Sequence, residues 1–290
     1  MNLKKLIFTK NRCYKAGKKI KPKGIMVHST GANNPNLRRY VGPDDGLLGR
    51  NTAGNHWNKD NLSVCVHAFI GKLKDGSIAT YQTLPWDHRG WHAGGKANDT
   101  HISFEICEDG LKDPDYFKLV YHEAVELCAY LCKEYGLTEK NIICHSEGYK
   151  KGIASNHSDV MHWFPKHGKS MDTFRADVKE LLEDKVEEYT QEEFVREVQA
   201  AIGATVDGIA GKETLSKTLT LSRYVNRSHK AVKPVQKRLY ALGYTVVGEA
   251  DGKTGVLFQK AVKEFQKDNG CFVDGEITKG KTTWRKLLGM

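Results

Sequence analysis

The sequence lacks a long apolar run and any Cys-x-x-Cys pair. No apolar stretch approaches the ~20 residues that a membrane-spanning helix needs, so we expect no membrane span. The seven cysteines are scattered and form no Cys-x-x-Cys pair, which argues against a disulfide framework and against a cysteine-rich zinc module. With 39% hydrophobic residues, 28% charged residues and only seven prolines, the composition is that of a soluble globular protein rather than a disordered chain.

The N-terminus also lacks the apolar core of a secretion signal. Its apolar stretch, residues 6–8, is far shorter than the ~7–15 residues of such a core. We therefore expect synthesis in the cytoplasm and no export by the general pathway. The net charge of +10 is compatible with an anionic partner or simply with good solubility. Because the basic residues are not interleaved with stacking aromatic residues, we expect no nucleic-acid partner.

Short apolar runs and helical patterns alternate through the first 183 residues. Apolar spacing at the helical period predicts two helices, at 115–135 and 170–183. An Asp-Gly turn at 75–76 predicts a hairpin. Short apolar or alternating runs predict strands at 24–27, 64–70, 78–81, 102–107 and 141–144. Strands interspersed with helices indicate one α/β domain over residues 1–183.

The last hundred residues carry helical patterns and an internal repeat. Residues 184–193 are polar and rich in acids, which predicts a linker. Beyond it, the pattern of 195–212 recurs at 262–279, an offset of 67 residues, with a glycine turn and a Val-Asp-Gly sequence in each copy. Such repetition indicates duplicated small modules. We therefore predict an all-α domain over 194–290, without a cluster of ligands or acids for a second active site.

Two histidines follow buried strands in the first domain and suggest a metal site. His28 follows the run 24–27, and His145 follows the run 141–144, so both imidazoles are expected at strand ends facing one cleft. For the third ligand, Asp159 competes with His157 and His162, and spacing alone leaves all three open. Two nitrogens and one carboxylate would leave a fourth tetrahedral position free, as in a catalytic zinc site.

Hydrolysis at such a site also needs a base and an oxyanion donor. Zinc would lower the pKa of its water to about 7 and polarise a substrate carbonyl. Glu105, on the predicted strand 102–107, is a candidate for the proton transfer, and the alternative is a strand carboxylate in a salt bridge. His157 is a candidate donor to the developing oxyanion.

Four motifs in order carry a resemblance to a known family. They are Met26-Val27-His28-Ser29-Thr30-Gly31, Trp91-His92-Ala93-Gly94, Ile102-Ser103-Phe104-Glu105-Ile106, and Cys144-His145-Ser146 through Ser158-Asp159. Over residues 20–182 the chain resembles the type 2 N-acetylmuramoyl-L-alanine amidases, which are related to peptidoglycan recognition proteins and common in phage endolysins. The resemblance implies a mixed β-sheet with flanking helices. It also implies hydrolysis of the amide that joins the lactyl group of N-acetylmuramic acid to L-alanine in peptidoglycan.

The same resemblance assigns roles to individual residues. It implies zinc bound by His28, His145 and Asp159, with Glu105 as catalytic acid and base and His157 as the group that stabilises the transition state. The interval between His145 and Asp159 is longer than in relatives, which keeps His162 as an alternative ligand. Trp91 and His92 fit a wall of the substrate groove or, alternatively, core packing beside the hairpin.

The C-terminal residues 235–288 resemble the helical peptidoglycan-binding module that is often attached to wall hydrolases, and 195–215 would be a degenerate half-copy. Together the two resemblances predict a phage or prophage endolysin that is held in the cytoplasm and acts on the cell wall after release. The alternatives are a recognition protein without catalysis and a zinc peptidase that cleaves cross-linking peptides. The sequence has no His-Glu-x-x-His motif to support the peptidase.

Overall fold

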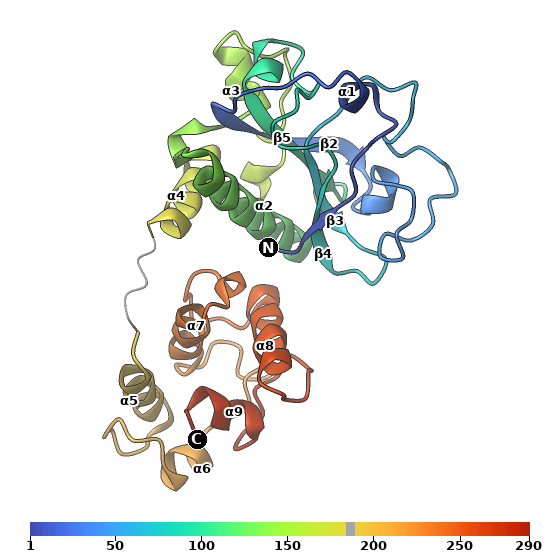
Figure 1. The fold of residues 1–290 in the computed structure, drawn as a ribbon. Helices are drawn as coiled ribbons and strands as arrows, with labels where there is room; N and C mark the ends of the chain where they lie inside the picture. Colours follow the sequence, from blue (N-terminus) through green and yellow to red (C-terminus); the bar gives the residue numbers. More distant parts are fainter. Residues whose placement is uncertain (184–188) are drawn as a thin grey trace. The chain divides into compact units, whose positions relative to one another are not determined.

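The computed structural model describes residues 1–183 and 189–290, and it divides the chain into two compact units, Met1–Asp184 and Lys185–Met290. The first unit is built on a six-stranded sheet in the order β1-β4-β3-β5-β2-β6 (Figure 1). The strands are β1 (Leu3–Lys5), β2 (Gly24–Asn33), β3 (Ala68–Lys72), β4 (Ile78–Gln82), β5 (His101–Glu108) and β6 (Ile142–Cys144). Only β3 and β4 pair antiparallel. The predicted mixed α/β fold is therefore confirmed.

The helices of this unit are α1 (Arg12–Lys15), α2 (Pro114–Tyr135), α3 (His145–Lys150) and α4 (Met171–Leu182). Helix α2 begins where the Asp113 carboxylate accepts two backbone N–H groups, and it ends at Gly136, whose φ of 64° few other residues tolerate. The apolar faces of α2 and α4 pack on alternate residues of the central strands, including Ile25, Val27 and Phe104.

The opposite face of the sheet carries the candidate ligand His28 and the candidate base Glu105. Because side chains alternate along a strand, His28 and Glu105 point away from the face that Val27 and Phe104 give to α2. Loops rather than long helices cover this second face, and their apolar side chains form a separate core around Phe69. Residues from these loops can therefore lie next to His28 and Glu105.

The predicted first strand of the hairpin is longer than the observed one. Prediction placed it at 64–70, whereas β3 begins at Ala68. Cys65 instead pairs with Trp91 through two backbone hydrogen bonds of 3.0 and 3.1 Å. Cys65 and Val66 are buried at this second pairing, whereas Val64 is exposed. Alternation along the chain does not reveal such a partner.

The second unit is helical over its described residues. Its helices are α5 (Gln191–Ile202), α6 (Lys212–Lys217), α7 (Val232–Ala241), α8 (Val256–Asp268) and α9 (Thr282–Leu287). The predicted linker, 184–193, overlaps this unit, because 191–193 form the first turn of α5 and the Thr190 side chain caps that helix. Residues 184–188 of that prediction lie outside the described residues.

A buried glutamine organises each copy of the repeat. Gln199 and Gln266 are each 1% exposed. The side-chain oxygen of each glutamine accepts the two N–H groups of an Asp-Gly turn, at 207–208 and 274–275. Gln236 holds the turn at 251–252 by a related pair of bonds, because its oxygen accepts the N–H of Gly252 and its nitrogen donates to the Asp251 carboxylate. The repeat thus has three glutamine-held turns, one more than the offset of 67 residues reveals.

Candidate metal centre and active site

His28 and Glu105 are brought together by the pairing of two parallel strands. The register of β2 and β5 places His28 directly beside Glu105. Residues paired in this way point to the same face of a sheet. The side chain of His28 is buried, at 1% exposure, near the centre of the sheet. The two predicted groups, one ligand and one base, therefore occupy neighbouring positions on rigid elements.

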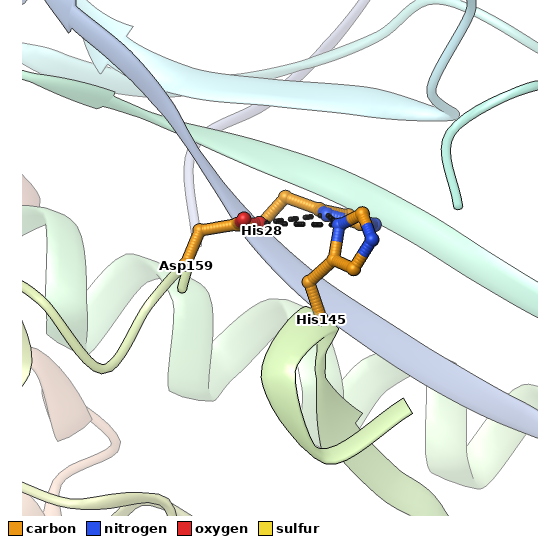
Figure 2. A group of neighbouring side chains, drawn as sticks. All are labelled: His28, His145 and Asp159. Atoms are coloured by element: carbon orange, nitrogen blue, oxygen red, sulfur yellow. Dashed lines mark hydrogen bonds and ion pairs between the residues drawn. The ribbon is translucent and has the colours of Figure 1, made fainter. Parts of the chain in front are cut away.

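His145 and Asp159 reach the same point from the neighbouring strand and a loop. Strand β6 pairs with β2 through Val27 and Cys144, so His145, the first residue of α3, lies next to His28. The loop that carries Asp159 is tied back to α3, because the N–H of Ser146 donates to the carbonyl of Asp159 at 3.4 Å. Figure 2 shows the three side chains pointing toward one another.

The geometry of the three groups fits a tetrahedral metal ion. The Nδ1 atoms of His28 and His145 are 3.1 Å apart. Asp159 Oδ2 lies 2.9 Å from Nδ1 of His28 and 3.6 Å from Nδ1 of His145. Bonds of about 2.0–2.1 Å to zinc would place ligand atoms about 3.3 Å apart in a tetrahedron. The observed separations bracket this value, so the three atoms could form one face of a zinc tetrahedron.

The charges of these groups also suit metal binding. Burial lowers the pKa of His28, although Asp159 acts in the opposite direction. The lowered pKa favours the neutral imidazole. Burial raises the pKa of Asp159, but its interactions with His145 and His28 outweigh this effect and hold that pKa well below its usual range. A neutral imidazole and an ionised carboxylate are the protonation states that ligands need.

The far nitrogens of both histidines have partners of their own. Nε2 of His28 lies 3.0 Å from Nδ1 of His92. Nε2 of His145 lies 3.2 Å from the hydroxyl of Ser155. With the far nitrogens engaged, the Nδ1 atoms are left to face the site. Sequence reasoning missed Ser155, because a lone serine in a loop carries no pattern.

Glu105 has the environment of a group that exchanges protons. Its Oε2 atom is buried and has no hydrogen-bond partner among the described residues. Burial raises the pKa of Glu105 well above its usual value, and the nearby carboxylates of Asp159 and Glu108 raise it further. Strongly shifted groups beside a candidate metal site are typical of active sites. The alternative, a strand carboxylate in a salt bridge, finds no support among the described residues.

The other candidate residues surround the three ligands. His157 is exposed, its ring centroid is 4.7 Å from that of His145, and its Nδ1 lies 4.0 Å from Asp159 Oδ1. His162 points elsewhere, because its Nε2 lies 2.9 Å from Oε1 of Glu108. Trp91 is 48% exposed, and the guanidinium of Arg89 lies 5.1 Å from its ring centroid. Exposure of this size argues against the core-packing alternative for Trp91.

Comparison with known families identifies the first unit. Residues 18–163, half of the chain, match the family described as N-acetylmuramoyl-L-alanine amidase. The chain belongs to this family. Residues 228–287 match a second family, described as a putative peptidoglycan binding domain. Both resemblances that the sequence motifs predicted are thereby confirmed.

Two curated amidases of Bacillus licheniformis are similar to this chain. N-acetylmuramoyl-L-alanine amidase CwlL is 27% identical over 268 residues, which cover 87% of this chain and 62% of that protein. A probable N-acetylmuramoyl-L-alanine amidase is 30% identical over 181 residues, which cover 62% of this chain and 43% of that protein. The chain thus spans less than two thirds of the length of either relative.

Solved structures show weaker likeness. The Staphylococcus aureus hydrolase AmiA in complex with its ligand is 18% identical with a TM-score of 0.47, covering 62% of this chain and 82% of that chain. A mutant endolysin from Bacillus subtilis is 22% identical with a TM-score of 0.42, covering 61% of this chain and 99% of that chain. In the described part of this chain, no helix combines the length and apolar character needed to cross a membrane.

Proposed function

We propose that the protein is a zinc-dependent amidase that cleaves the bond between N-acetylmuramic acid and L-alanine in peptidoglycan. The observation that carries this proposal is the convergence of His28, His145 and Asp159 beside Glu105 within the amidase family region. The second unit, which contains the putative peptidoglycan binding region, supports the same substrate.

The chain's own residues supply the steps of the reaction. His28, His145 and Asp159 would hold the ion through Nδ1, Nδ1 and a carboxylate oxygen. A zinc ion there supplies a Lewis acid and lowers the pKa of a water to about 7. Glu105 accepts a proton from the attacking water as the water oxygen bonds to the lactyl carbonyl carbon. Glu105 then returns that proton to the nitrogen of L-alanine as the C–N bond breaks.

Neighbouring side chains would bind the substrate. His157 lies at the exposed edge of the ligand group and is proposed to donate to the developing oxyanion. Trp91 offers an exposed aromatic face to the substrate. In His92, Nδ1 faces His28, and Nε2 is buried without a partner among the described residues. We propose that this ring forms part of the wall of the substrate groove.

The proposed function assigns a different role to each of the two units. We propose that residues 1–183 form the catalytic domain, that the linker lies within 184–193, and that residues 194–290 hold the enzyme on the wall polymer. Tethering raises the effective concentration of scissile bonds near the active site. We further propose a phage or prophage endolysin that is made in the cytoplasm and reaches the wall after release.

Digestion of purified cell walls tests the proposal. We expect new L-alanine amino termini without new reducing sugar ends, and we expect a zinc chelator to abolish the product. Zinc added back should restore activity, and this restoration is the control for damage by the chelator. Other new amino termini would indicate the zinc peptidase. Absence of any product in zinc-supplemented buffer would indicate a recognition protein without catalytic activity.

Wall binding should weaken at high salt. The chain carries a net charge of +10, and the Debye length falls from about 10 Å at 0.1 M salt to about 3 Å at 1 M. We expect the fraction of the full-length Glu105→Gln variant that sediments with walls to fall between these salt concentrations. Walls stripped of phosphate-containing polymers are the control. Binding that is insensitive to salt would show that charge does not drive adsorption.

A further inference from the structure

One short turn supports the outer side of both candidate ligand histidines, contacting His28 directly and His145 through Ser155. Nδ1 of His92 lies 3.0 Å from Nε2 of His28. Ser155 lies 3.2 Å from Nε2 of His145, and its hydroxyl donates to the carbonyl of Ala93 at 3.1 Å. Since that hydroxyl has given its only proton to Ala93, the Ser155 oxygen must accept from His145. Consecutive residues, His92 and Ala93, thus support the two ligands.

Asn98 fixes the orientation of these two residues. It is 1% exposed, and its side-chain oxygen accepts the backbone N–H groups of His92 and Ala93, each at 2.9 Å. Its own N–H donates to the carbonyl of Gly95 at 3.1 Å, which closes the turn. One buried amide therefore sets the direction of the His92 side chain and of the Ala93 carbonyl.

The turn is also locked against the segment that carries Ser155. The N–H of Ser155 donates to Ala93 at 2.8 Å, and the N–H of Ala97 donates to Ile153 at 2.9 Å. Gly94 has φ of +64°, and a Cβ there would lie 2.9 Å from the Ser155 hydroxyl. A Cβ on Gly95 would lie 2.5 Å from the carbonyl oxygen of Ile153. The close approach explains both glycines in the motif that follows Trp91.

We infer that the turn from His92 to Asn98 is a shared outer support for the metal centre, with Asn98 as its positioning residue. With an ion bound, the support would give the Nε2 proton of each ligand imidazole an acceptor, so that each Nδ1 could present its lone pair to the ion. Outer partners of this kind orient ligating histidines and raise their basicity. The inference rests on the proposed zinc site and adds residues that do not contact the ion.

Paired variants of Asn98 test the support in the full-length protein. Asn98→Leu removes the acceptor for two backbone N–H groups, and we expect the zinc dissociation constant, measured by competition with a chromophoric chelator, to rise about 10–100-fold. Asn98→Asp keeps an oxygen acceptor and should stay close to the wild type.

A second pair covers the case in which Asn98→Leu fails to fold. His92→Phe keeps a ring without an acceptor, and it should weaken zinc binding, whereas His92→Asn places an acceptor oxygen where Nδ1 stood and should restore it. Zinc binding as tight as that of the wild type in the folded Asn98→Leu or His92→Phe variant would overturn the inference. Failure of the wild type itself to bind zinc would instead contradict the proposed metal centre.

Discussion

Replacing Asp159 with alanine is expected to abolish tight zinc binding and to bring wall hydrolysis to background. The variant keeps only the two nitrogens of His28 and His145, and these no longer face a carboxylate at 2.9 and 3.6 Å. The loss of affinity should exceed the about 10–100-fold typical of an outer partner, because a direct ligand is removed. Zinc content after dialysis and the dissociation constant measure the effect.

His162→Ala is the matched control for that experiment. His162 lies three residues further along the chain and was an open alternative for the third ligand. The structure directs its Nε2 toward Glu108 at 2.9 Å rather than toward the ligand group. We expect the His162→Ala variant to keep its zinc. Loss of zinc from this variant, together with retention in Asp159→Ala, would show that the third ligand is wrongly assigned.

The two histidines could be predicted because local patterns mark them. Each follows a short buried run, and parallel pairing of β2 with β6 places Val27 beside Cys144 and so brings the two histidines together. The predicted strand end at His28 is wrong, however, because β2 continues to Asn33 and His28 lies within it. The third ligand could not be chosen in this way. Asp159, His157 and His162 share one irregular loop, and only contacts of that loop, such as Ser146 N–H with the Asp159 carbonyl, decide which side chain turns inward.

Several structural features depend on contacts that no periodic pattern marks, and they could not be predicted from the sequence. The side-chain oxygen of Asn98 accepts a backbone N–H group within its own turn, and the Ser155 hydroxyl donates to the carbonyl of Ala93, 62 residues away. Neither residue belongs to a periodic pattern. In the second unit, Gln236 holds a turn 15 residues further on, whereas the other two glutamines hold turns 8 residues further on. Repetition at a fixed offset finds the equal spacings and misses the unequal one.

Replacing Glu105 with glutamine is expected to lower kcat by about 10²–10⁴-fold, the usual contribution of a well-placed acid or base. Glutamine keeps the size and the hydrogen-bonding capacity of the side chain but cannot accept the proton of the attacking water. Glu105 lies beside His28 without belonging to the ligand group. The zinc dissociation constant should therefore stay unchanged. Single-turnover hydrolysis of a muramoyl-peptide measures the loss.

Glu108→Gln is the matched control, and it gives the sign of the pH effect. Glu108 is a second buried carboxylate on β5, and its charge helps to raise the pKa of Glu105. A base works only when deprotonated, so kcat/KM should fall on the acid side of the Glu105 pKa. Neutral glutamine at 108 removes the raising charge, and this acid limb should move to lower pH with little loss of maximal rate. If Glu105→Gln retained kcat, or if it lost activity only in proportion to lost zinc, Glu105 would not be the base.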